Sequence, residues 1–197
     1  MKLPLLFLLL PVLLCAQPQY NFEGETLNFE LSRSPADSSA LLWSVSGDYY
    51  FSNLHSEDLR RLIAFPVPSS DSVGVAKILE LSLIEPGDSM RVELLSQWEQ
   101  GFNFRLDLPR RSFCGVRIRY TQEITGHEAR YVLLTANSWG RPLPSCEMHL
   151  FVEPGLVPES IPYEDQSLIA LNQVASWHWS ITDFVPDKDF IVRLRDD

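Results

Sequence analysis

The sequence predicts an all-β protein, an antiparallel β-sandwich of the jelly-roll or immunoglobulin-like type with about eleven strands. Two observations lead to this fold class. Apolar and polar residues alternate at every second position in several separate stretches, and turn-forming residues lie between those stretches. Because neighbouring side chains of a strand point to opposite faces, such alternation gives each strand one face for the core and one for water.

The individual strands are predicted from this alternation. It is clearest at Phe102, Phe104, Leu106 and Leu108, which are separated by polar residues. The complete set of predicted strands, in chain order, is 27–32, 41–46, 49–53, 75–84, 89–97, 102–108, 113–123, 129–136, 147–152, 176–181 and 189–195.

Three turns are predicted where reversals of the chain are needed. Residues 85–88 (Glu-Pro-Gly-Asp) separate the strands 75–84 and 89–97, and a proline followed by a glycine suits a tight reversal. Gly47-Asp48 would join 41–46 to 49–53, and residues 125–127 would join 113–123 to 129–136.

Helix is scarce, with one or two short helical segments expected. Residues 56–58 (Ser-Glu-Asp) could cap a turn that carries Leu59 and Leu62 on one side, and Pro66 would end it. A second candidate covers 164–173, after a proline-spaced stretch that we interpret as an extended connection within one domain.

Residues 1–16 are predicted to be a signal peptide, followed by a single domain over 17–197. Lys2 precedes an apolar run over 3–14, which as a helix would rise only about 18 Å, well short of the ~30 Å bilayer core. Cleavage is expected between Ala16 and Gln17. An alternative stays open, because 12–15 loosely resembles a lipoprotein box in which Cys15 is acylated. Only lipidation of Cys15 would tether the protein to a membrane.

The net charge of the chain indicates whether nucleic acid is an expected partner. The 26 acidic and 16 basic side chains give a net charge of −10, which would repel phosphate backbones, so nucleic-acid binding is not expected.

Beyond the leader, Cys114 and Cys146 are the two cysteines. In an oxidising compartment they are candidates for one disulfide. The alternative is two unlinked buried thiols.

No catalytic set, cofactor site or metal site is predicted. Gly87-Asp88-Ser89 resembles the nucleophile block of the Gly-Asp-Ser esterases, but the downstream Asp-x-x-His pair is missing. The histidines are scattered and lack zinc-motif spacing. The four are His55, His127, His149 and His178.

Tryptophans are the candidate binding residues. Trp177 and Trp179 lie two apart on a predicted strand and therefore share one face, which would be either a stacking platform for sugar rings or part of the core. Trp139 lies in turn-like sequence, where an exposed indole is a more credible contact residue.

Several short aromatic-rich segments are similar to segments of other proteins. They are 49–53, 65–68, 131–135 with the following Trp139, and Trp177 with 184–186 and 189–190. Over about residues 40–195 the chain resembles bacterial secreted domains of unknown function. The resemblance implies an extracytoplasmic β-sandwich, and it carries over no catalytic residue.

The sequence therefore predicts an exported, non-enzymatic protein of the periplasm, cell surface or medium. It would act by surface recognition of a protein or glycan partner, or as a structural part of the cell envelope. The alternative is a carbohydrate-binding module that uses Trp139, Trp177 and Trp179, and a small secreted hydrolase is a third hypothesis.

Overall fold

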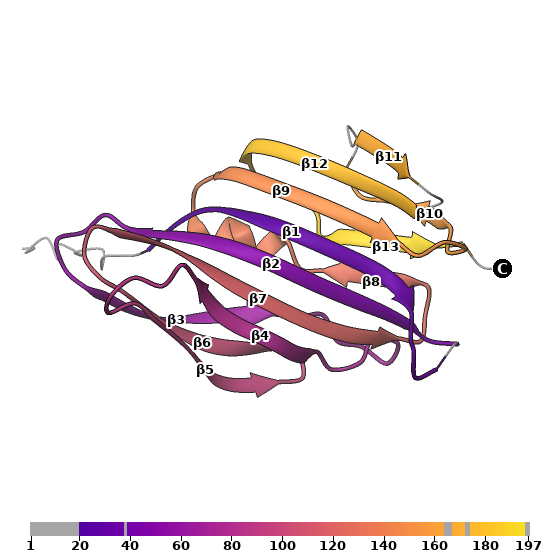
Figure 1. Ribbon diagram of the computed structural model, residues 1–197, viewed down its shortest axis with the longest axis horizontal. Helices are drawn as coiled ribbons and strands as arrows, with labels where there is room; N and C mark the ends of the chain where they lie inside the picture. The colour runs from indigo at the N-terminus through magenta and orange to yellow at the C-terminus, as the bar shows by residue number, and fades with distance from the viewer. Residues whose placement is uncertain (1–19, 38, 164–166, 172–173, 196–197) are drawn as a thin grey trace, which may run out of the picture.

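The computed structural model describes residues 20–37, 39–163, 167–171 and 174–195, and it confirms the all-β sandwich (Figure 1). A single 3-10 helix accompanies the strands in this part of the chain. The elements are β1 (Asn21–Arg33), β2 (Leu41–Asn53), β3 (Leu59–Pro66), β4 (Lys77–Ile84), β5 (Arg91–Trp98), β6 (Gly101–Leu108), β7 (Ser112–Ile124), β8 (Glu128–Tyr131), η1 (Leu134–Trp139), β9 (Leu143–Val152), β10 (Pro158–Ser160), β11 (Ser167–Leu171), β12 (Val174–Phe184) and β13 (Phe190–Leu194).

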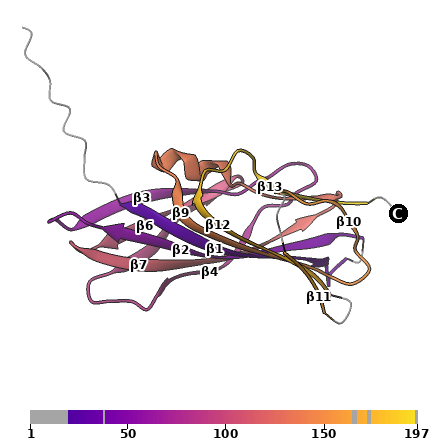
Figure 2. The ribbon, with the colours of Figure 1, turned by 90° about the horizontal axis from the view of Figure 1, so that it is seen from above.

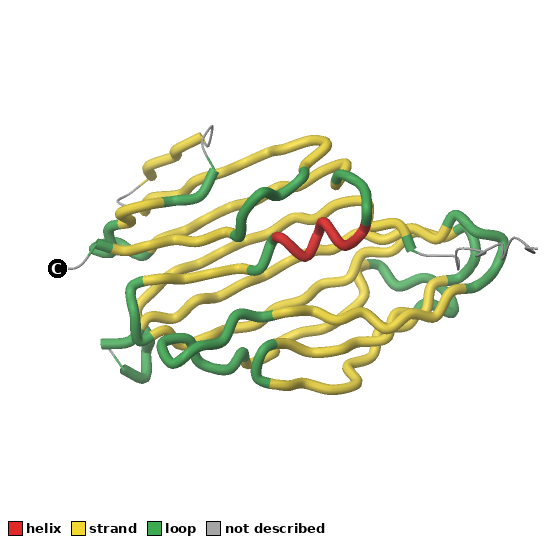
Figure 3. Tube along the Cα trace, turned by 180° about the vertical axis from the view of Figure 1, so that it is seen from behind, coloured by secondary structure: helices red, strands yellow, loops and turns green. Residues whose placement is uncertain are grey.

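The strands form one wide sheet faced by two narrow ones. The wide sheet has the order β11-β12-β9-β1-β2-β7-β4, and the narrow sheets have the orders β10-β13-β8 and β3-β6-β5. Figure 2 shows the layers from the side, and Figure 3 shows the face that carries the two narrow sheets. The strand pairs are antiparallel except β1 and β9, which are parallel and join the N-terminal and C-terminal parts of the wide sheet.

The core lies between the layers and is rich in aromatic rings. On β1, Leu27, Phe29 and Leu31 point inward and are fully buried. Phe29 stacks on Trp43 of β2 at a centroid distance of 5.2 Å and on Phe190 of β13 at 4.4 Å. The alternation seen in the sequence thus becomes one continuous inner face, and Phe29 connects it to the opposite layer.

The predicted turn at Gly47-Asp48 is wrong, because β2 runs unbroken through both residues. A Cβ atom at Gly47 would lie 2.3 Å from the hydroxyl of Tyr49, so glycine is needed here to make room for that ring. Asp48 points to the outer face and accepts two hydrogen bonds of 2.7 Å from Arg117 on the neighbouring strand β7.

The other two predicted turns exist, but they do not close hairpins. The segment 85–88 leads from β4 in the wide sheet to β5 in a narrow sheet, and 125–127 leads from β7 to β8 in the same way. Turn residues predict that the chain reverses. They do not predict which strands the two flanking segments pair with, because that depends on the rest of the core.

Both predicted helical segments are corrected by the structure. Residues 59–66 form strand β3, which pairs along its whole length with β6. The second segment lies partly outside the described residues, and its described portion is strand β11. The helix that does form, η1, covers the end of the predicted strand 129–136.

The predicted signal peptide and Cys15 lie outside the described residues. Of the residues that are described, none belongs to a helix with the length and apolar character needed to span a bilayer.

Of the two alternatives for Cys114 and Cys146, the structure shows the unlinked pair: the candidate disulfide is not formed, and both thiols are free and buried. Cys114 lies on β7 and Cys146 on β9, with β1 and β2 between these strands. Three strand spacings amount to about 14 Å, whereas a disulfide joins Cα atoms less than about 7 Å apart. The wide sheet therefore holds the two cysteines too far apart to bridge.

The Gly47→Ala variant tests the role of Gly47. The added methyl group would displace the Tyr49 ring, so we expect a loss of about 1–3 kcal/mol in the free energy of unfolding, measured by urea denaturation. Ser46→Ala, on the opposite face of the same strand, is the matched control and should change little. Equal stability of Gly47→Ala and the wild type would show that Tyr49 does not need this space.

Candidate functional site

A cleft opens where the two narrow sheets fail to join. Strands β3 and β8 are the end strands of their sheets, and each leaves one backbone edge without a strand partner in the described part of the chain. The cleft between them has a volume of about 290 Å³, and the inner face of the wide sheet forms its floor. Its lining residues are Phe22, Glu25, Tyr49, Phe51, Leu62–Pro66, Phe104, Ile118, Tyr131–Leu133, Thr135, Ala136, Ser138 and Trp139.

One wall of the cleft is the helix η1, and a buried acid fixes its position. Asp189 accepts hydrogen bonds from the backbone N–H groups of Leu133 and Leu134 at 2.9 and 3.0 Å, and its other oxygen accepts from Arg130. Burial alone would raise the pKa of Asp189, but these hydrogen bonds and the Arg130 charge lower it below the ordinary value. Asp189 therefore stays ionised and anchors the start of η1.

Trp139, at the end of η1, brings the indole to the cleft. Its ring lies 5.5 Å from that of Phe22 and 5.8 Å from that of Phe51, measured between centroids. The side chain is partly buried and lines the cleft. Of the three predicted binding tryptophans, Trp139 is the one that the structure places in the cleft.

Trp177 and Trp179 share one face of β12, as their spacing predicts, but that face points inward. Trp179 is only 2% exposed and packs edge-on against Phe190, and Trp177 is partly buried against the core. Their strand partners Leu150 and Met148 are themselves buried core residues. The two indoles therefore form no exposed platform for a sugar ring.

The polar centre of the cleft is Glu25, which the sequence analysis did not single out. A β-bulge between Phe22 and Gly24 shifts the alternation of β1, so that Phe22 and Glu25 both face inward. At Gly24 a Cβ atom would lie 2.5 Å from the carbonyl oxygen of Ser145, so only glycine allows β9 to approach this closely. The alternation of Leu27, Phe29 and Leu31, extended back by one step, was the available signal for an inward Glu25.

Glu25 is buried without a counter-charge. It is 4% exposed and lies at 3.7 Å from the thiol of Cys146, which donates to it, and no ion pair of Glu25 occurs among the described residues. Burial raises its pKa to about 7. Removal of a carboxylate from water is costly, so the group keeps its proton in weakly acidic solution.

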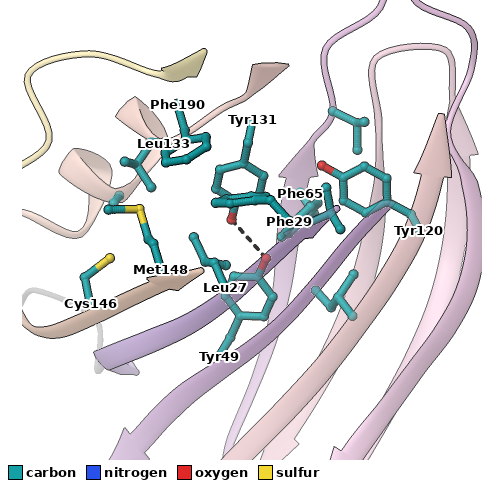
Figure 4. Packing of buried hydrophobic residues seen from close by; sticks show 14 of the residues in the cluster. Leu27, Phe29, Tyr49, Phe65, Tyr120, Tyr131, Leu133, Cys146, Met148 and Phe190 are labelled. Carbon is teal, nitrogen blue, oxygen red and sulfur yellow. Dashed lines mark hydrogen bonds between the residues drawn. The ribbon is translucent and has the colours of Figure 1, made fainter. Parts of the chain in front are cut away.

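Two tyrosine hydroxyls form a second polar feature of the cleft. Tyr49 of the wide sheet and Tyr131 of β8 share a hydrogen bond of 2.9 Å, drawn as a dashed line in Figure 4. Burial raises the pKa of both tyrosines well above the usual value, so both stay protonated. The rings of Tyr131 and Phe65 also pack against one another across the cleft, at a centroid distance of 6.5 Å.

A separate polar cluster lies on the outer face of the wide sheet. His149 of β9 and His178 of β12 are direct partners in the antiparallel register, and their rings stack at 4.5 Å. Glu147 lies 2.8 Å from Nε2 of His178. Partial burial, followed by the His178 charge, lowers the pKa of His149. Sequence spacing gave no sign of this cluster, because strand pairing alone unites its members.

The comparisons with known proteins define the fold rather than the activity. No family model matches the chain, and no curated protein matches it. Its structure resembles a "putative nutrient binding protein" of Legionella pneumophila, with a TM-score of 0.68 and 15% identity over 91% of this chain and 68% of that chain. It also resembles an M1 zinc metallopeptidase of Deinococcus radiodurans, with a TM-score of 0.52 and 10% identity over 88% of this chain and 42% of the peptidase. At these identities the likeness shows a shared β architecture, and the chain spans less than half of the peptidase.

The Glu25→Gln variant tests the buried acid through pH. The unfolded chain loses this proton near its ordinary pKa of 4.5, whereas the folded protein holds it to about 7. The stability that the raised pKa contributes is therefore present below about pH 4.5 and is lost as the pH rises through 7. From pH 5 to 8 we expect the free energy of unfolding of the wild type to fall by on the order of 3 kcal/mol from this group.

Glu25→Gln should abolish that pH-dependent loss and should be the more stable protein at pH 8, as measured by urea denaturation at both pH values. Glu30→Gln, at an exposed position of the same strand, is the matched control and should keep the wild-type dependence. A wild-type slope that survives in Glu25→Gln would contradict the assignment.

Proposed function

We propose that this chain is an exported, non-enzymatic binding protein that holds a small, largely apolar ligand in the cleft between its two narrow sheets. The observation that carries the proposal is the combination of an apolar, aromatic-walled cleft with one buried carboxyl at its floor. Small-molecule sites typically have volumes of about 300–1,000 Å³, apolar walls and a few placed polar groups, and this cleft, at about 290 Å³, is close to the smallest of them.

The lining suggests what the ligand looks like. Phe22, Phe51, Phe65 and Trp139 would contact an apolar or aromatic body. The carboxyl of Glu25 would donate a hydrogen bond when protonated, and it would pair with a cation when ionised. An apolar group with a single amine or hydrogen-bonding end therefore fits the chemistry of the cleft best.

Export is the second part of the proposal. It rests on the leader-like residues 1–16, in which one cation is followed by a short apolar run and a small residue. The Legionella protein of similar architecture is described as a "putative nutrient binding protein", which supports a binding role.

Ligand binding can be tested with 1-aminoanthracene, an aromatic amine whose fluorescence rises in apolar surroundings. We expect one probe molecule to bind per chain and the tryptophan emission of the protein to be partly quenched, because Trp139 lines the cleft. In Leu62→Arg the binding should weaken by about tenfold, equivalent to about 1.4 kcal/mol, because the charge would lie at the mouth of the cleft. Leu62 is 62% exposed, so its replacement should leave the fold intact.

Leu79→Arg provides the matched control for that experiment. Leu79 is also an exposed strand leucine, at 52%, but it does not line the cleft. Equal weakening in both variants, or no saturable binding to the wild type, would contradict a ligand site in the cleft.

Export can be tested by the intact mass of the protein recovered from a bacterial host. We expect a chain that begins at Gln17, because Ala16 provides the small residue before the cleavage site. A chain that begins at an acylated Cys15 would establish the lipoprotein alternative instead. Recovery of the full-length chain from the cytoplasm would contradict export.

A further inference from the structure

We propose that Glu147, His149 and His178 form a binding site for a zinc-like divalent cation on the outer face of the wide sheet. The site is separate from the cleft and does not depend on the function proposed for it. Two imidazoles and one carboxylate are a donor set that zinc takes in proteins.

The backbone fixes which side chains meet. His149 and His178 are direct cross-strand partners, and Glu147 precedes His149 by two residues, so all three point to the same side of the sheet. The alternate residues Met148 and Leu150 point to the opposite side and are fully buried. The hydrophobic core therefore holds the three polar side chains outward, in a fixed register.

The distances suit a single ion. One donor atom from each residue can be chosen so that all three lie within 4.8 Å of one another. In a tetrahedral site with bonds of about 2.0–2.2 Å, donor atoms lie about 3.3–3.5 Å apart. Small side-chain rotations would therefore bring the three donors onto one ion, and a fourth ligand such as water would complete the tetrahedron.

A neighbouring hydroxyl helps to orient the carboxylate. The hydroxyl of Ser180, which is the strand partner of Glu147, donates a hydrogen bond to one carboxylate oxygen, while the other oxygen faces His178. Partners of this kind hold metal ligands in position, and their loss typically costs about 10–100-fold in affinity. All three ligand residues are partly buried, which limits competition from bulk water.

A bound ion would also affect the fold at one edge of the wide sheet. It would join β9 to β12, and β12 is the strand on which the edge strand β11 pairs. Because the folded sheet creates the site, zinc should raise the melting temperature of the protein.

The test is a calorimetric titration of the tag-free protein with Zn²⁺, paired with thermal unfolding. We expect one ion per chain and a higher melting temperature on binding. His149→Gln and His178→Gln should each weaken binding by about 100-fold or more, and Ser180→Ala by about tenfold. His55→Gln, which removes an exposed histidine outside the cluster, is the matched control and should bind zinc like the wild type.

An experiment on the unaltered protein guards against variants that fold poorly. In a zinc titration followed by backbone NMR, the largest shifts should fall on β9 and β12 around the three ligands. The proposal is overturned if zinc does not bind, if binding survives in His149→Gln and His178→Gln, or if the shifts centre elsewhere on the chain.

Discussion

Burial of the inner face of the wide sheet, with Phe29 at its centre, is the packing on which the rest of the molecule depends. Phe29 contacts Trp43 within its own sheet and Phe190 and Tyr131 in the opposite layer. Phe65 connects the other narrow sheet to Tyr49 and Tyr120 of the same face. Both narrow sheets are therefore held by aromatic contacts to one floor rather than by strand pairing with each other, and this is why a cleft is left between them.

The cleft combines features that stabilise the fold with one that does not. Asp189 is buried but receives hydrogen bonds from η1 and Arg130, so its charge is compensated. Glu25 is buried and accepts a hydrogen bond from a thiol. Its raised pKa reflects the free-energy cost of holding an ionised carboxyl away from water. An apolar residue at position 25 would fit the core without that cost. Under the proposed function, this single polar group would fix the orientation of an otherwise apolar ligand in the cleft.

The two candidate sites lie on opposite faces of the same wide sheet, the cleft over β1, β2 and β7 and the polar cluster on β9 and β12. On β9, Cys146 and Met148 face the core, whereas Glu147 and His149 face outward. On β1, Glu25 points inward, beside Cys146 in the parallel register. Successive side chains of a strand point to opposite faces of the sheet. The apolar site therefore lies on the inner face and the polar cluster on the outer face, with one layer of backbone between them. Ligand binding in the cleft and zinc binding outside it can be tested independently for this reason.

The sequence by itself determined the fold class, most strand positions and the inward direction of Phe102, Phe104, Leu106 and Leu108, because the period of two is a local property of extended backbone. It misassigned Gly47 as a turn and 59–66 as a helix, since glycine and a capping sequence act locally, whereas the space for Tyr49 and the pairing of β3 with β6 are tertiary. It also could not foresee that Cys114 and Cys146 lie three strands apart, or that His149 meets His178. Those outcomes depend on strand order and register, which only the packing of the complete core decides.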